Sequence, residues 1–285
     1  MKNRNCSVTD ALVTVLATVC AIFPLKAEAG DYDAEFTRKT KFGLYKVRTA
    51  SCNDGRVRLI ISKNGKTLLD QTADHYFLTD PGTKEPTLQA EGKKIPTYDL
   101  RGLGEQDIVV MTWSGGAHCC YMYDMYALSN TLKHVWHHDT GDGHFLGYKK
   151  NAHGAPFLLI EDQTFRYYIT NVPEMPVVVL RWQNGKFRVD RARMKTGLDR
   201  YPPLKISEVK EYLEKGSEQP LTAYVLNLYY CGKAREADQF INEVLPVESH
   251  VPTIESRADY RAGFLKQLKK SPFYADIKAI NGGRL

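Results

Sequence analysis

The sequence predicts an α+β protein in which a β-rich N-terminal part is followed by a small helical part. Up to about residue 195, short apolar or alternating runs recur between turn residues, which is the pattern of β-hairpins. From Ile206 onward, apolar residues recur three and four positions apart, which is the period of an α-helix. With 285 residues and 43% hydrophobic side chains, the chain can bury a core. We therefore expect a β-rich domain over residues 30–200 and a helical domain over residues 201–285.

The strands of the β-rich part are placed by their apolar runs and by the turns between them. Asn64-Gly65 and Asn184-Gly185 each separate two such runs, and Asn-Gly pairs favour the type I′ turn of a two-residue hairpin. The expected strands cover residues 42–47, 56–61, 107–113, 120–128, 157–160, 177–182 and 187–189.

The helical part begins with an apolar stripe at Ile206, Val209 and Leu213. Residues 221–245 carry two further stripes with Gly232 between them, where a helix end favours a left-handed residue, so we expect a helical hairpin. Residues 257–269 predict another helix. Ser271-Pro272 is expected to open a short last helix, with the serine as N-cap.

The first 29 residues have the plan of a secretory signal peptide. A positive start is followed by a largely apolar run over residues 11–25 and by Ala27-Glu28-Ala29, the small-x-small pattern of a cleavage site. An uncleaved N-terminal anchor is the alternative. We expect a periplasmic or secreted protein with no membrane span after cleavage, because no later apolar run reaches about 18 residues.

Export changes the expectation for the cysteines. Four remain after residue 29, and in an oxidising compartment disulfides are expected. They are Cys52, Cys119, Cys120 and Cys231. Three pairings are open; we favour Cys52 with Cys119 or Cys120, and Cys231 with the other or unpaired.

Residues 99–110 have the rhythm of a turn that leads into a strand, with Asp99, Gly102, Gly104 and Asp107 as its key positions. This stretch resembles the D-x-[DN]-G-D-G-x-x-D loop of integrin-type (FG-GAP or VCBS-like) β-propeller repeats, in which the early acids bind calcium and the last acid begins a strand. Arg101 and Leu103 stand where that family has oxygen ligands. Because a cation repels calcium, we expect the loop shape to persist without the metal.

A weaker copy of this loop follows about 50 residues later. Residues 149–157 keep Asn151 and Gly154 of the pattern, and a period of that length suits a propeller blade. The β-rich part would hold about three blades, whereas a closed propeller has at least four. The resemblance therefore implies a degenerate propeller-like domain, with an open β-meander or a sandwich equally compatible.

Between the two copies lies the segment Ser-Gly-Gly-Ala-His-Cys-Cys, residues 114–120. It resembles a segment of uncharacterised bacterial secreted proteins with this repeat type. Those proteins also resemble the chain over residues 141–145, 162–165 and 178–181. This second resemblance implies no activity.

Six of the eight histidines lie between residues 118 and 153. They are either metal ligands or catalytic groups, or ordinary polar residues of loops and strand edges. His118, His134 and His138 are the metal-ligand candidates, because a regular strand turns His134 and His138 to one face and His137 to the other. For a hydrolytic role the candidates are His118, Asp142 and His144. A thiol nucleophile in the cysteine pair is disfavoured by disulfide formation.

A Tyr-rich strand follows the motif and offers a binding face with Trp113, Tyr121 and Tyr123, unless alternation buries part of it. The net charge of +6 is mild, and no basic block points to nucleic acid. We expect a binding or structural module with an envelope protein or glycan as partner and no cofactor. The alternative is a metal-dependent or hydrolytic enzyme centred on the motif and the histidines after it.

Overall fold

A computed structural model describes residues 34–79, 81, 97–115, 120–143, 145–168, 175–196, 204–247, 254 and 256–285. Over these residues the protein is α+β, with three four-stranded antiparallel sheets and six helices. The expected signal peptide lies outside the described residues, as do His118, Cys119 and His144.

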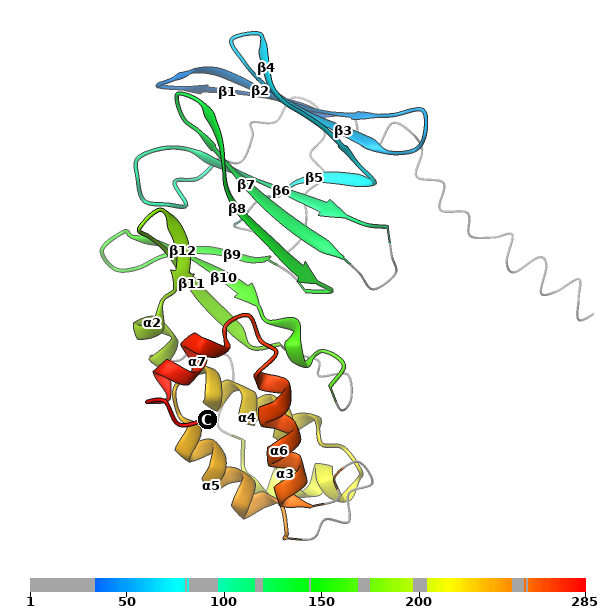
Figure 1. Ribbon diagram of the computed structural model, residues 1–285, viewed down its shortest axis with the longest axis vertical. Helices are drawn as coiled ribbons and strands as arrows, with labels where there is room; N and C mark the ends of the chain where they lie inside the picture. The colour runs from blue at the N-terminus through cyan, green and yellow to red at the C-terminus, as the bar shows by residue number, and fades with distance from the viewer. Residues whose placement is uncertain are drawn as a thin grey trace, which may run out of the picture.

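Each sheet is a meander, because its strand order follows the chain (Figure 1). The first sheet comprises β1 (Ala34–Thr40), β2 (Gly43–Ser51), β3 (Val57–Lys63) and β4 (Lys66–Ala73). The middle sheet comprises β5 (His75–Thr79), β6 (Asp107–Trp113), β7 (Tyr121–Leu128) and β8 (Leu132–Gly141). The third sheet comprises β9 (Phe145–Lys150), β10 (Pro156–Glu161), β11 (Val177–Gln183) and β12 (Lys186–Val189).

Both Asn-Gly hairpins are confirmed. Asn64 and Gly65 have φ values of 48° and 82°, and Asn184 and Gly185 have 50° and 80°. Positive φ at both central residues defines the type I′ turn, which matches the twist of the flanking strands. The sequence analysis missed β1, β5, β8 and β9 as strands, and each of them lies at an edge of its sheet.

The middle sheet lies between two hydrophobic cores. Ile108 and Val110 of β6 pack in a core shared with the first sheet, whereas Val109 and Met111 pack in a core shared with the third sheet and the helices. A strand buried on both faces reads as a continuous apolar run, and β6 has that sequence. Figure 1 shows the resulting stack, with the helices at its lower end.

The helices follow the expected stripes. They are α2 (Arg191–Lys195), α3 (Ile206–Glu214), α4 (Gln219–Tyr230), α5 (Ala234–Val244), α6 (Arg257–Leu268) and α7 (Tyr274–Ile280). Gly232, at φ 77°, ends α4 in a Schellman motif, in which the backbone N–H of Lys233 bonds to the carbonyl of Leu228.

The last helix begins two residues later than expected. Phe273 rather than Ser271 is its N-cap. The Ser271 hydroxyl accepts from the backbone N–H of Phe273 in the turn before the helix and donates to the buried carboxylate of Asp162. Tyr230 of α4 donates a second hydrogen bond to Asp162 at 2.5 Å. Asp162 follows β10, so this network ties the third sheet to the helices, and both share one hydrophobic core. A domain boundary near residue 200 stays a prediction.

Within the described part of the chain, no helix is long and apolar enough to span a membrane.

Candidate functional site

A β-bulge in β8 decides which histidines meet. Met125 pairs with Trp136 and Tyr126 pairs with His134, so Val135 between them has no partner on β7. A bulge inserts one extra residue and reverses the alternation beyond it. His134 and His137 therefore share one face, and His138 lies on the other. The expectation that His134 and His138 face the same way is wrong for this reason.

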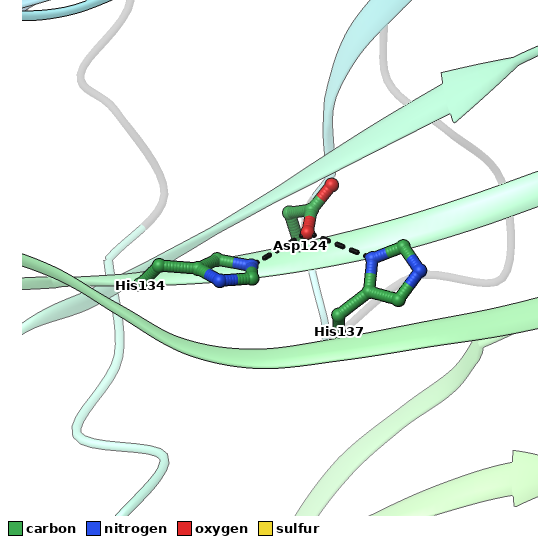
Figure 2. Close-up of side chains that lie close together, drawn as sticks. All are labelled: Asp124, His134 and His137. Carbon is green, nitrogen blue, oxygen red and sulfur yellow. Dashed lines mark hydrogen bonds and ion pairs between the residues drawn. The ribbon is translucent and has the colours of Figure 1, made fainter.

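Three potential metal ligands converge on the face that carries His134 and His137. Asp124 lies directly opposite His137 on β7. Its Oδ1 atom is 2.6 Å from Nε2 of His134 and 2.9 Å from Nδ1 of His137 (Figure 2). Figure 2 shows the carboxylate between the two imidazole rings. The ligand atoms lie within 4.8 Å of one another, a spacing that one metal ion can bridge.

This cluster lies at the margin of the core between the first and middle sheets. Tyr126, two residues from Asp124 on the same face, is buried in that core, and its ring centroid is 5.2 Å from that of His134. Burial raises the pKa of Tyr126, and the Asp124 carboxylate raises it further. The side chains of His134 and His137 are 48% and 51% exposed, and that of Asp124 is 20% exposed. The cluster therefore has a buried wall and a solvent-facing side.

The opposite face of β8 contributes Trp136 and His138 to a cleft of about 660 Å³. The two rings stack with centroids 5.4 Å apart, and the His138 ring is 6.2 Å from that of Phe273. Burial lowers the pKa of His138, and this effect outweighs the carboxylates of Asp162 and Asp139. Burial therefore favours the neutral form of the His138 imidazole.

Strands β11 and β12 and helices α2 and α7 supply the rest of the cleft. Four basic and two acidic side chains line it, namely Arg181, Lys186, Arg188, Arg191, Asp190 and Asp276. Arg191 pairs with Asp276 at 2.7 Å and Arg181 with Asp190 at 3.6 Å. Among the described residues, no carboxylate lies within ion-pair distance of Lys186 or Arg188. Arg188 is also directly opposite Arg181 in the strand pair. The cleft is therefore electropositive.

The loop before β6 is closed by hydrogen bonds and ion pairs between its own residues. The Asp99 carboxylate accepts from the backbone N–H groups of Leu103 at 2.8 Å and Gly104 at 2.9 Å. The buried guanidinium of Arg101 donates to Asp107 at 2.9 Å and to Glu105 at 2.8 Å. These carboxylates are neutralised from inside the loop. The residues present therefore do not fit calcium, because a cation already stands among its ligands.

The loop at residues 149–157 is closed by a related turn. The side-chain oxygen of Asn151 accepts from the backbone N–H groups of His153 and Ala155 at 3.0 and 2.8 Å, and Gly154 has φ 77°. Asp99 and Asn151 thus perform the same local task, in which a side-chain oxygen binds the backbone N–H groups of its own turn.

The favoured disulfide is wrong. Cys52 and Cys231 do not form disulfides, so neither is joined covalently to the motif. Cys120 is disulfide-bonded, and its partner lies outside the described residues. The sequence pattern gave the number of cysteines but not their distances, and connectivity depends on the distances.

The other predicted site residues do not form one cluster. Trp113 and Tyr121 stack beside each other with ring centroids 6.3 Å apart, and their role in a binding face stays a prediction. Tyr123 is only 2% exposed, and its place in the core excludes it from a binding face. Asp142 accepts a hydrogen bond from Tyr167 at 2.6 Å and lies 3.5 Å from Arg166. It is separate from the cleft and from the Asp124 cluster.

Sequence reasoning missed Asp124 and gave His137 the wrong face. The spacing His134-x-x-His137 was visible, but it becomes a same-face pair only through the bulge. No family model matches the chain, and no curated protein is significantly similar to it in sequence.

Proposed function

We propose that the protein is an exported binding module of the cell envelope or extracellular space, and that it binds an acidic saccharide in the cleft between β8, β12 and α7. The observation that carries this proposal is that aromatic rings line the cleft together with basic side chains for which no carboxylate partner is described. Trp136 and Phe273 line the cleft together with Lys186 and Arg188. Its volume of about 660 Å³ suits a small ligand rather than a macromolecular surface.

The chemistry of these groups selects for a sugar that carries a carboxylate. Flat aromatic faces pack against the C–H faces of pyranose rings, and indole does so over a large area. Arginine binds carboxylates with two parallel hydrogen bonds. Like charges directly opposite on a strand pair are unfavourable, so an anion between Arg181 and Arg188 would stabilise the local structure.

An open, propeller-like stack is the architecture that we propose for the β-rich part. Three consecutive meanders support it, because a propeller blade is a four-stranded meander. The related Asp99 and Asn151 turns, each preceding the second strand of its sheet, support it as well. The N-terminal sequence supports export.

A hydrolytic function has less support from the described residues. Both cleft carboxylates, Asp190 and Asp276, are engaged by arginines, whereas a general acid or base needs a free or proton-sharing group. Asp142, the acidic candidate from the sequence, is held by Tyr167 and Arg166 away from the cleft.

The test is calorimetric titration of the protein with the trisaccharide of galacturonic acid and with its methyl ester, which has the same shape but no charge. The acid should bind, and the ester should bind at least about tenfold more weakly, since a charge-assisted contact contributes about 1.5–3 kcal/mol. Arg188→Gln should weaken binding of the acid by a similar factor. Arg48→Gln, an exposed arginine on β2, is the matched control and should change nothing.

Four results would overturn the proposal. Equal affinity for acid and ester would exclude carboxylate recognition. Equal losses in the Arg188 and Arg48 variants would indicate diffuse charge attraction rather than a site. Absence of binding to both this trisaccharide and a glucuronic-acid analogue at millimolar concentration would exclude acidic sugars. Displacement by equimolar inorganic phosphate would reassign the cleft to phosphate-bearing ligands.

A further inference from the structure

We infer that Asp124, His134 and His137 form a binding site for a divalent transition-metal ion, with zinc or copper as the best match. The site lies on the face of β8 opposite the cleft and is independent of saccharide binding. Two imidazole nitrogens and one carboxylate oxygen are borderline donors, which suit zinc, copper or nickel rather than calcium or magnesium.

The distances are those of a site that needs only a small expansion. Ligand atoms around a tetrahedral zinc ion are about 3.3 Å apart, because each lies about 2.0 Å from the metal. The two distances from Asp124 Oδ1 are 2.6 and 2.9 Å. Lengthening them to about 3.3 Å requires shifts of about 0.4–0.7 Å at half-exposed histidine side chains. Such movements are well within rotamer freedom at the surface.

The backbone fixes these three residues more firmly than a loop would. Asp124 and His137 are direct partners in the ladder between β7 and β8, and His134 pairs with Tyr126 one step beyond the bulge. Without the extra residue at Val135, His134 and His137 would lie on opposite faces. Bulges are frequent where a strand must re-aim a side chain at a functional site. Here the bulge has the specific effect of bringing two nitrogen ligands to one carboxylate.

The three ligands are covered by protein on one side and open to solvent on the other. The Tyr126 ring packs beside His134 and forms part of its buried wall. Three protein ligands with a solvent-facing fourth position are the pattern of a zinc site that can hold water or an exogenous ligand. The alternative is a carboxylate that merely shares hydrogen bonds with two imidazoles, and the experiment below separates the two.

The experiment measures metal binding to the full-length protein purified without a histidine tag. After dialysis against chelator, titration with Zn²⁺ followed by calorimetry should show one equivalent bound, with an affinity that falls on acidification because protons compete for the ligands. His134→Ala and His137→Ala should each weaken binding by more than about tenfold, since even outer-shell changes cost 10–100-fold. His153→Ala, an exposed histidine on another turn, is the matched control and should bind like the wild type.

Two further measurements separate this site from others on the chain. Substitution with Co²⁺ should give visible d–d bands without a thiolate-to-cobalt charge-transfer band, because the ligands are nitrogen and oxygen. The melting temperature should rise with Zn²⁺ in the wild type but not in the His134→Ala/His137→Ala double variant. The far-ultraviolet circular dichroism of each metal-free variant shows that it is folded.

The inference is overturned if less than about one fifth of an equivalent binds at saturating zinc, a sign of adventitious contact. It is also overturned if the His134 and His137 variants bind as tightly as the His153 variant. A thiolate charge-transfer band would assign the metal to a cysteine outside a disulfide, such as Cys52, and reject the Asp124 site.

Discussion

Replacement of Arg101 by methionine tests whether the loop before β6 is held together by an internal cation. The Arg101 side chain is 5% exposed, and the Asp107 carboxylate that it contacts is fully buried. Methionine keeps much of the apolar volume but removes the charge. Asp107 then retains the backbone N–H of Leu100, at 3.0 Å, as its described hydrogen-bond donor. Removal of one partner from a buried ion pair costs about 3–5 kcal/mol at neutral pH.

The dependence of this cost on pH follows from the pKa of Asp107. Burial raises that pKa to about 6 even though Arg101 lowers it. A folded-state pKa above the unfolded value of about 3.9 means that the native state binds more protons, so stability falls as the pH rises through this window. In Arg101→Met the pKa rises further, and the loss of stability extends above pH 6. For one titrating group, the free energy of unfolding falls by at most about 1.4 kcal/mol per pH unit.

We expect the destabilisation by Arg101→Met to be about 1 kcal/mol at pH 5, where Asp107 is mostly protonated, and about 3–5 kcal/mol at pH 8. Urea unfolding followed by far-ultraviolet circular dichroism measures both values. Tryptophan fluorescence provides a second probe, because the guanidinium lies 5.5 Å from the Trp182 ring. The double variant Arg101→Met/Asp107→Leu should recover most of the loss. A difference that is independent of pH, or below about 1 kcal/mol at pH 8, would refute the reasoning.

Three other predictions concern the helices and the cleft. Gly232→Ala should destabilise the protein more than Gly216→Ala in urea unfolding, although both glycines have φ 77° and share a backbone strain of about 1–2 kcal/mol on substitution. The reason is that a Cβ at Gly232 would lie 2.9 Å from a backbone oxygen at the end of α7, whereas Gly216 faces open space. Equal losses in the two variants would contradict this packing argument. Tyr230→Phe removes a hydrogen bond to the buried Asp162 carboxylate and should cost about 1.5–3 kcal/mol by the same assay, with a loss below 0.5 kcal/mol as the contrary result. An NMR titration should give His138 a pKa below its model-peptide value of 6.5, because burial disfavours the imidazolium. Its contribution to stability should therefore be present above pH 6.5 and lost on acidification, and a midpoint above 6.5 would show that the ring is not desolvated.

Local sequence signals accounted for the elements whose conformation is set by near neighbours. The Asn-Gly hairpins, the stripes of α3 to α6 and the Gly232 helix end were all predicted, because turn chemistry and helical periodicity act over a few residues. The polar edge strands were missed. A strand such as β8 forms through its pairing with β7, and its own sequence carries little alternation.

The candidate site was likewise predictable only where a feature depends on residues close together in the sequence. The histidines between residues 118 and 153 and the degenerate turn at Asp99 were visible in the sequence. The unpaired Val135, the approach of Asp124 and the freedom of the Cys52 thiol were not, since each depends on a partner strand or on a distance through space.

The sequence by itself determined the α+β class, the type I′ turns and the presence of a cation, Arg101, among the acidic residues of the loop before β6, because these follow from local conformational preference and from the charge of single residues. Only the tertiary structure decided that Arg101 neutralises Asp107 from within, that His134 and His137 share a face, and that β8 separates a metal-ligand cluster from an electropositive cleft. The physical reason is that strand register decides on which face of the sheet each side chain lies. One extra residue in one strand reverses that assignment for every side chain beyond it.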